Sequence, residues 1–303
     1  MKITKNTPIG EALFLCPESA DVFLEYGMQC VMCHAAAWET IEQGAQSHGM
    51  PTKTIQELVK KINTLYIEQE SAEELKEETS KPKICLPIQE RSQKKIIETF
   101  EKYQNSFDLF EVWLDKVIDL NLKELIAKKT KPLICVCKGE EEKGSFRDSE
   151  EDRLQILISA AQTGSDFIDI GIHTKPSLIK KFIKNKGDSS LILSSHNWNK
   201  TPKLTTILST VNKMIPFKPD LIKYVSWAEN YEDNIQIMRL AENLKKKNLK
   251  FITMTMGDAG KFSRIFTPLL GSSWMYAPLK TTSASAAGQI SVDDLKIIWE
   301  KVG

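Results

Sequence analysis

Three residues in the second half of the chain could together act on a carbonyl compound: Lys223, His196 and Arg264. Lys223 stands in the middle of the apolar run PDLIKYVSW (219–227), with no carboxylate beside it in the sequence. Burial disfavours the charged form of a lysine and lowers its pKa, which frees the amine to attack a carbonyl carbon. We therefore predict a Schiff-base lysine at position 223. The structural alternative is a lysine whose ammonium reaches water along its apolar stem.

The other two residues suit the same chemistry. An iminium makes the neighbouring C–H bond acidic enough for an imidazole near neutral pH to remove the proton, and His196 is a candidate for that base. The imidazole could then protonate a leaving hydroxyl, so that water is lost from a β-hydroxy ketone. The planar guanidinium of Arg264 suits a carboxylate. Single arginines usually form surface ion pairs and single histidines at strand ends are usually structural, but the three residues together favour an active site.

The segments around these residues alternate between short apolar strands and amphipathic helices. The predicted strands are 84–88, 107–115, 131–137, 166–172, 190–195, 219–227, 250–256 and 273–277. The predicted helices are 91–104, 119–128, 150–163, 176–185, 202–214, 229–247, 260–268 and 292–301. Such a pattern predicts an α/β fold, a (β/α)8 TIM barrel over residues 83–303. A doubly wound sheet is the alternative, but no glycine-rich phosphate loop follows the first strand.

A barrel would bring the carboxyl ends of these strands, and the loops that follow them, to one face. Polar residues occur at those places in nearly every unit. They are Glu111, Asp115, Lys138, Glu142, Asp169, His196, Lys223, Arg264, Ser285 and Gln289. We expect these side chains to surround one site.

Four segments in this region resemble a known family. LSSHNWNKTP, DLIKYVSW, TMTMGDAGKFSR and TSASAAGQIS together resemble type I 3-dehydroquinate dehydratase, the Schiff-base lyase of the shikimate pathway, over about residues 83–303. The resemblance implies that Lys223 forms the iminium with the ketone of 3-dehydroquinate and that His196 is the general acid and base. It implies no cofactor and no metal in this reaction.

The resemblance also implies roles for the surrounding polar residues. Glu142 matches the acid that orients the histidine, and Arg264 matches the arginine that binds the substrate carboxylate. Ser285 and Gln289 match a lid that closes over the substrate, and Glu111 matches a glutamate that contacts its hydroxyls.

Two positions depart from the family pattern. Trp113 stands where the family has an arginine, and alternation along the strand puts it on the same face as Glu111 and Asp115. Lys138 replaces a second arginine as a substrate-binding residue, and Lys143-Gly144 replaces a glycine pair. Because a lysine lacks the arginine fork, we predict weaker binding of 3-dehydroquinate or a modified substrate.

Residues 1–66 form a separate, small helical domain in this prediction. Cys30 and Cys33 form a CxxC motif that precedes the helix-forming stretch 35–49, so we place Cys33 near a helix N-terminus, where the thiolate is favoured. The pattern CPESADVFLEYGMQCVMCHAAAWETIEQGAQSHGM closely resembles the redox-disulfide domain associated with hybrid-cluster proteins. This resemblance implies that Cys30 and Cys33 can be oxidised reversibly.

Two other interpretations of the motif remain. The cysteines could only pack, or they could bind zinc together with some of Cys16, His34 and His48, although no second CxxC completes a standard zinc set. Residues 67–82 carry six glutamates and are predicted to be a charged linker or an exposed helix.

Composition limits the partners that we expect. The 41 basic residues are balanced by 40 acidic ones, which argues against a nucleic-acid partner. No signal-peptide core and no run of about 18 apolar residues is found, so we expect a soluble, cytoplasmic protein without membrane contact. Its partner is then a small keto acid, with a homodimer as a candidate assembly. Cys85, Cys135 and Cys137 are predicted to be buried packing residues.

Three functions therefore stay open at this point. The first is 3-dehydroquinate dehydratase activity, modulated by the attached redox domain. The second is a lysine-dependent dehydratase or aldolase for another hydroxy keto acid, favoured by Trp113 and Lys138. The third is a catalytically inactive, redox-responsive binding protein.

Overall fold

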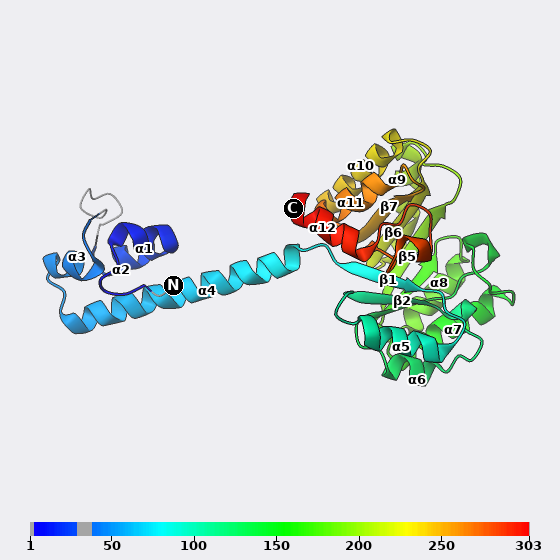
Figure 1. Cartoon of the computed structure of the whole chain (residues 1–303), viewed down its shortest axis with the longest axis horizontal. Helices are drawn as coiled ribbons and strands as arrows, with labels where there is room; N and C mark the ends of the chain where they lie inside the picture. The colour runs from blue at the N-terminus through cyan, green and yellow to red at the C-terminus, as the bar shows by residue number, and fades with distance from the viewer. Residues whose placement is uncertain (1–2, 29–37, 303) are drawn as a thin grey trace. The chain divides into compact units, whose positions relative to one another are not determined.

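The computed structural model describes residues 3–28 and 38–302, without the side chains of residues 68–80 and of Ser283. The chain divides into two compact units, Met1–Lys81 and Pro82–Gly303 (Figure 1). Within the described residues, no helix is both long enough and apolar enough to cross a membrane.

The regular secondary structure described in the first unit is helical. Its helices are α1 (Ile9–Leu15), α2 (Ser19–Glu25), α3 (Ile41–Ser47) and α4 (Thr52–Ser80). Helix α3 begins with a capping box, in which Thr40 and Gln43 each accept a hydrogen bond from the backbone N–H of the other. The helix expected over 35–49 therefore begins only at Ile41 in the described part. Of the two alternatives predicted for residues 67–82, a charged linker or an exposed helix, the structure has the helix, because α4 continues to Ser80.

A small apolar core holds this first unit together. Its fully buried members include Ile9, Phe23, Met28, Ile41 and Leu58. Cys16 is buried in the same cluster, and burial raises the pKa of its thiol.

The second unit alternates eight parallel strands with helices. The strands are β1 (Ile84–Ile88), β2 (Leu109–Trp113), β3 (Leu133–Val136), β4 (Phe167–Gly171), β5 (Ser190–Asn197), β6 (Leu221–Trp227), β7 (Phe251–Met256) and β8 (Met275–Tyr276). The helices are α5 (Gln93–Tyr103), α6 (Leu122–Ala127), α7 (Glu150–Thr163), α8 (Pro176–Asn185), α9 (Leu204–Met214), α10 (Glu232–Lys246), α11 (Lys261–Leu269) and α12 (Val292–Val302). Single-turn 3-10 helices include η3 (Leu114–Lys116), η4 (Glu140–Glu142), η5 (Ile215–Phe217) and η6 (Thr281–Ser283).

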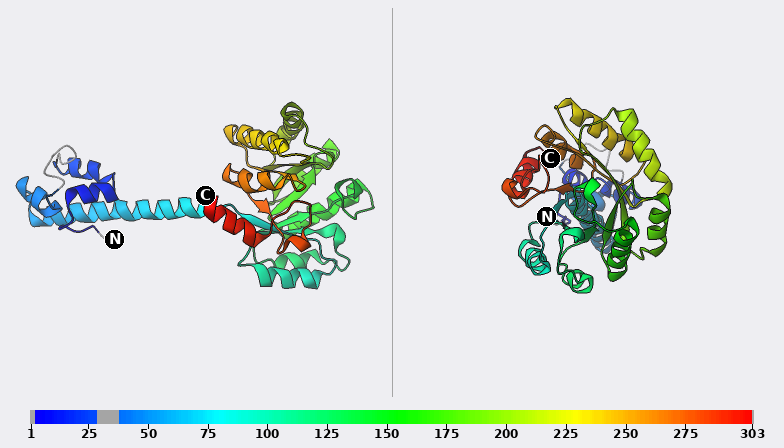
Figure 2. Two further views of the ribbon diagram at one scale, coloured as in Figure 1. Left: turned by 45° about the horizontal axis from the view of Figure 1, so that its top comes forward. Right: turned by 90° about the vertical axis from the view of Figure 1, so that its right-hand side faces the viewer.

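The strands pair in the order β7-β6-β5-β4-β3-β2-β1-β8. The sheet curls until its two edges meet, where the Ser273 N–H donates to the Phe251 carbonyl at 2.8 Å. The predicted TIM barrel is confirmed, and the doubly wound sheet is wrong. Figure 2 shows the helices of this unit around the outside of the strands.

Local signals account for the helices whose bounds were predicted best. Helix α7 begins after Ser149, whose hydroxyl accepts the Asp152 N–H, and ends at Gly164 in the left-handed conformation. Helix α8 begins with Pro176 at its first position. The second predicted strand was too long, because β2 ends at Trp113 and Asp115 lies in η3.

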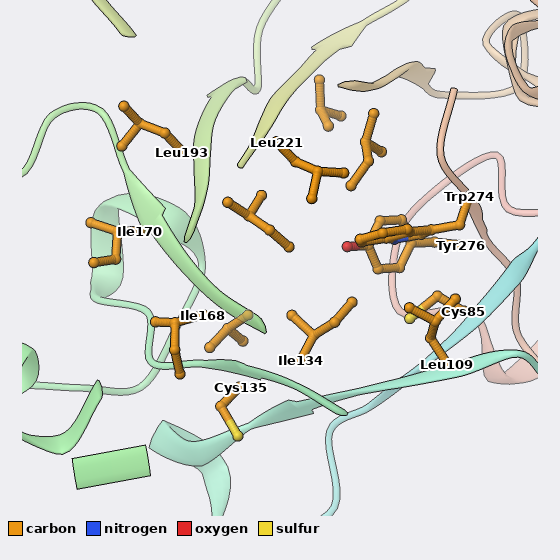
Figure 3. Close-up of a cluster of buried hydrophobic side chains, with 14 of the residues drawn as sticks. Cys85, Leu109, Ile134, Cys135, Ile168, Ile170, Leu193, Leu221, Trp274 and Tyr276 are labelled. Carbon is orange, nitrogen blue, oxygen red and sulfur yellow. The ribbon is translucent and has the colours of Figure 1, made fainter. Parts of the chain in front are cut away.

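The interior of the barrel, below the carboxyl ends of the strands, is apolar. Figure 3 shows Leu109, Ile134, Leu221 and Tyr276, from four different strands, in one cluster of buried side chains. The predicted burial of Cys85, Cys135 and Cys137 is confirmed, and all three are free thiols. Burial raises the pKa of Cys135 and of Cys137 to about 12, so neither is a reactive thiolate at neutral pH.

Candidate active site

A pocket of about 220 Å³ opens at the carboxyl ends of the strands. It contains most of the residues that the sequence singled out. Its walls include Glu111, Trp113, Lys143, His196, Trp198, Lys223, Trp227, Arg264, Tyr276, Ser285 and Gln289. The barrel thus brings together residues from β2 to the segment after β8.

Lys223 lies in the middle of β6 and is buried, as expected, but it is not unpaired. Its Nζ lies 2.9 Å from Asp169 Oδ2, 3.4 Å from Glu111 Oε2 and 3.1 Å from the Tyr276 hydroxyl. Burial by itself lowers the pKa of Lys223, but the charges of Asp169 and Glu111 outweigh it and raise the pKa above its ordinary value. The expected lowered pKa of Lys223 is therefore wrong. The amine rests as an ammonium there.

Asp169 on β4 links two lysines. Its Oδ2 binds Lys223, and its Oδ1 lies 2.7 Å from Lys138 Nζ and accepts the Ser194 hydroxyl at 2.5 Å. Burial raises the pKa of Asp169, but the two ammonium groups outweigh it and hold the pKa well below the ordinary value. Asp169 is therefore a carboxylate fixed between two cations.

Lys138 occupies a different place from the one predicted. It does not line the pocket wall, because its Nζ is buried between Asp169 Oδ1 and Glu142 Oε1, at 2.7 and 3.0 Å. Its ammonium is thus engaged with protein carboxylates. A contact between Lys138 and substrate has no support in this geometry.

Glu142 reaches the imidazole that it was predicted to orient. Its Oε1 lies 3.6 Å from His196 Nδ1, and its Oε2 lies 3.5 Å from His173 Nε2. Burial raises the pKa of Glu142, but Lys138 and His196 outweigh it and lower the pKa below the ordinary value. The carboxylate is therefore charged when it faces the imidazole.

His196 is the residue of β5 that faces the pocket at its carboxyl end. Burial lowers the pKa of His196, the adjacent Glu142 raises it, and Lys223 and Lys138 lower it again, with a net shift downward. The ring stacks on Trp198, with centroids 5.3 Å apart. With Nδ1 turned to Glu142, a neutral imidazole has Nε2 left for the pocket.

Arg264, on the first turn of α11, is 1% exposed and lines the pocket. Its Nη1 contacts the Met254 sulfur at 3.3 Å, and within the described residues no carboxylate lies within ion-pair distance. Burial lowers the pKa of Arg264 to about 10. A buried guanidinium without a counter-charge is costly, so this position favours an anionic ligand.

The segment after β8 covers one side of the pocket. The Ser285 N–H donates to Gln289 Oε1 at 2.9 Å, and the Gln289 side chain donates to the Ser285 hydroxyl at 3.1 Å. The Gly257 N–H donates to the Ala287 carbonyl at 3.1 Å, which ties this segment to the loop after β7. Gly288 has φ +78°, and a Cβ there would lie 2.0 Å from the Gly257 carbonyl oxygen.

Comparison with known proteins assigns the barrel, with its pocket, to a known family. Residues 84–301 match the family described as type I 3-dehydroquinase. The chain belongs to the type I 3-dehydroquinase family. Residues 3–55 match a second family, described only as a domain of unknown function (DUF1858).

Several named relatives of the barrel are 3-dehydroquinate dehydratases. The one from Dehalococcoides mccartyi is 30% identical over 221 residues, which cover 73% of this chain and 96% of the relative. The one from Methanocaldococcus jannaschii is 30% identical over 220 residues, covering 71% and 97%. A crystal structure of the Clostridium difficile type I enzyme with covalently modified comenic acid is 26% identical, with a TM-score of 0.67 over 73% of this chain and 92% of that one.

The departure at Trp113 alters the pocket of this type I 3-dehydroquinase. The indole lines the pocket, as expected, and its Nε1 donates to Glu111 Oε1 at 3.0 Å. Glu111 is thereby held between Trp113 and Lys223. The expectation for Asp115 is wrong: its oxygens accept the backbone N–H groups of Lys138 and Ser145, at 3.0 and 2.8 Å, so it shapes the loop after β3.

Sequence reasoning missed several residues around the site. Tyr276 contacts the Lys223 ammonium, and Trp198 and Trp227 line the pocket. Arg153 on α7 is buried, with its guanidinium bound to the Cys137 carbonyl and the Thr174 hydroxyl. Trp198 and Trp227 lie in the segments LSSHNWNKTP and PDLIKYVSW, and Tyr276 lies in the predicted strand 273–277. Nothing local marks Arg153, which lies in an ordinary amphipathic helix.

One group of side chains beside the pocket has the spacing of a metal site. In the part of the chain that is described, the one group with spacing suited to a metal is Glu141, Glu142 and His173. Two cations, Lys138 and Arg153, lie 3.0 and 3.9 Å from the Glu142 oxygens and disfavour a metal ion there. The predicted redox residues Cys30 and Cys33, and the alternative ligand His34, lie outside the described residues.

Proposed function

We propose that the barrel, residues 83–303, dehydrates 3-dehydroquinate to 3-dehydroshikimate through a Schiff base at Lys223, in the shikimate pathway to aromatic amino acids. The observation that carries this proposal is one pocket that holds a buried amine, a partly exposed imidazole and a buried guanidinium with no ion-pair partner among the described residues. Membership of the type I 3-dehydroquinase family supports the same reaction.

The first step is attack of the Lys223 amine on the substrate ketone. The ammonium must first lose a proton, and the oxygens of Asp169, Glu111 and Tyr276 around it offer a route. Loss of water from the carbinolamine gives an iminium, which again places a positive charge on this nitrogen. The carboxylates that raise the pKa of Lys223 therefore also stabilise the iminium.

Proton transfer through His196 completes the dehydration. Neutral His196 removes a proton from the carbon next to the iminium, and Glu142 stabilises the resulting imidazolium. The enamine then expels the β-hydroxyl, which leaves as water with the proton returned by His196. Hydrolysis of the remaining iminium consumes one water, releases 3-dehydroshikimate and restores the Lys223 amine.

The remaining pocket residues hold the substrate. Arg264 is proposed to bind the carboxylate, which supplies a counter-charge that no described residue gives to its buried guanidinium. We propose that Glu111, which lines the pocket, contacts substrate hydroxyls and that Ser285 and Gln289 close over the substrate. Lys138 is better explained as a residue that positions Asp169 and Glu142 than as a substrate ligand.

The test is intact mass after the full chain is mixed with 3-dehydroquinate and borohydride. We expect an adduct on the wild type, none on Lys223→Ala, and an adduct on Lys213→Ala, which removes a lysine from α9. Dehydratase activity should be lost only in the first variant. An inactive wild type, or an adduct that persists in Lys223→Ala, would contradict the proposal.

Trp113 favours a second candidate, a Schiff-base dehydratase or aldolase for another hydroxy keto acid. The indole replaces a cation in the pocket and also engages Glu111. The same trapping experiment with a panel of hydroxy keto acids distinguishes the two. A panel member that is trapped and turned over with higher kcat/KM than 3-dehydroquinate would favour the second candidate.

The sequence alone supports a redox role for Cys30 and Cys33, a cytoplasmic location and a homodimer. We propose that Cys30 and Cys33 form a reversible disulfide that modulates the barrel, and that the enzyme acts in the cytoplasm as a homodimer. A redox titration followed by thiol alkylation measures the first, and sedimentation measures the oligomeric state. A catalytically inactive binding protein is the outcome if no keto acid is trapped.

A further inference from the structure

Lys143 is an unusual residue on the pocket wall. It follows η4 directly, and its backbone has φ 65° and ψ 21°, in the left-handed region that residues other than glycine rarely adopt. Its side chain is exposed and lines the same pocket as Lys223 and His196. A costly backbone conformation beside a functional pocket suggests a functional reason for it.

The turn places the left-handed residue at this position. The Lys143 N–H donates to the Glu140 carbonyl at 3.0 Å, and the Gly144 N–H donates to the Gly139 carbonyl at 2.8 Å. A Cβ on Gly144 would lie 1.8 Å from the Lys138 carbonyl oxygen, so the backbone packs tightly here. A glycine at position 143 would meet the same geometry without strain.

Within residues 3–28 and 38–302, the Lys143 ammonium has no hydrogen-bond or ion-pair partner. Three glutamates precede it, yet each is engaged elsewhere: Glu140 with Arg147 at 2.8 Å, Glu141 with His173 at 3.3 Å, and Glu142 with Lys138 at 3.0 Å. Among the described residues, no carboxylate lies within 4.0 Å of the Lys143 ammonium. Lys143 and Arg264 are thus two unpaired cations on one pocket.

These two cations approach the pocket from opposite sides. Lys143 follows β3 and Arg264 follows β7, and these strands are four apart in a barrel of eight. A ligand whose carboxylate binds Arg264 would therefore turn its other oxygen-bearing edge toward Lys143. Charge-assisted hydrogen bonds from an ammonium to such oxygens are stronger than neutral ones.

We propose that Lys143 is a substrate-binding residue, which contacts the oxygen atoms on the substrate edge opposite the carboxylate bound by Arg264. This inference rests on the proposed dehydratase function. It assigns to Lys143 the role that the sequence had assigned to Lys138, whose ammonium is engaged with Asp169 and Glu142.

The test is Lys143→Gly, which removes the cation and relieves the strained backbone at once. We expect KM for 3-dehydroquinate to rise about fivefold to tenfold, with a smaller change in kcat, since a rim contact contributes to binding in both ground and transition states. Salt should raise the KM of the wild type more than that of Lys143→Gly, because salt screens exposed charges.

Lys218→Gly is the matched control. Lys218 also follows a 3-10 helix with a left-handed backbone, φ 49°, but it lies before β6 and away from the pocket walls. Both variants should unfold at the same or higher urea concentration than the wild type, and only Lys143→Gly should change KM. If the wild type is active and the KM of Lys143→Gly lies within twofold of the wild-type KM, Lys143 does not bind substrate. That result would leave the dehydratase function standing. An inactive wild type would overturn the dehydratase function and this inference with it.

Discussion

Nζ of Lys223 lies 2.9 Å from Oδ2 of Asp169, so the nucleophile rests in an ion pair rather than as a desolvated free amine. The other oxygen of Asp169 binds Lys138, which in turn binds Glu142 beside His196. A single chain of buried charges thus joins the nucleophile to the proposed base. Changes at any of these residues should alter both stability and the charge state of its neighbours.

Asp169→Asn should be strongly destabilising. It leaves Lys138 and Lys223 buried without their shared carboxylate, and breaking a buried pair on one side costs about 3 to 5 kcal/mol. The measurement is urea unfolding of the full chain, monitored by a spectroscopic signal that comes from the barrel. Ser194→Ala removes the hydroxyl that donates to the same Asp169 oxygen and lies 3.4 Å from Lys138 Nζ, but it removes no charge and should cost only about 1 kcal/mol. Equal losses in the two variants would contradict a central role for Asp169.

Lys138→Met should move the acid limb of the kcat/KM profile to higher pH. His196 must be neutral to accept a proton, and Lys138 is one of the charges that lower the pKa of His196. Removing that charge raises the pKa of His196, so activity should appear at higher pH than in the wild type. Lys123→Met, on the exposed side of α6, should leave the profile unchanged. An acid limb that stays in place would show that Lys138 does not act on His196.

The barrel should lose stability on acidification from about pH 6.5. The pKa of His196 in the folded chain lies below its ordinary value of 6.5, so below that pH the unfolded chain binds a proton that the folded chain does not. Glu142, whose pKa is also lowered, adds a second loss below its ordinary value of 4.5. The urea midpoint should fall as the pH is lowered from about 7 to about 5. His196→Asn should flatten that dependence, and an unchanged slope would argue against a lowered pKa of His196.

Gly288→Ala should impair the lid. The added Cβ would lie 2.0 Å from the Gly257 carbonyl oxygen, so the covering segment would have to shift away from the loop after β7. We expect kcat/KM to fall at least about tenfold, as small displacements of a closing segment cost such factors. Gly187→Ala imposes a similar left-handed strain, φ +56°, where a Cβ meets open space, and should leave kcat/KM unchanged. Similar kinetics in both variants would mean that the lid tolerates the shift.

Trp113→Arg should tighten the binding of 3-dehydroquinate. It removes the indole N–H from Glu111 and adds a cation at a position that lines the pocket. We expect KM to fall about fivefold, because an arginine can bind substrate oxygens with more than one N–H group. Trp113→Phe, which removes the N–H and adds no charge, separates the two effects. A KM that rises in Trp113→Arg would favour a substrate that needs the aromatic surface.

Patterns along the sequence determined the architecture and most of the pocket. Alternating strands and amphipathic helices predicted the barrel, and local caps such as Ser149 and Gly164 fixed helix α7, because such signals act within a few residues. A barrel brings the carboxyl ends of all strands together, so Lys223, His196 and Arg264 could be predicted to meet.

Only the tertiary structure decided the charge state and the partners of these side chains. Lys223 and Asp169 are 54 positions apart, and Lys223 and Glu111 are 112 apart, so no local pattern indicates that they pair. Coulomb interaction depends on distance across the barrel, and this pairing reversed the expected shift in the pKa of Lys223. For the same reason the sequence could name Lys138 and Lys143 as unusual, and the fold decided which of the two faces the pocket.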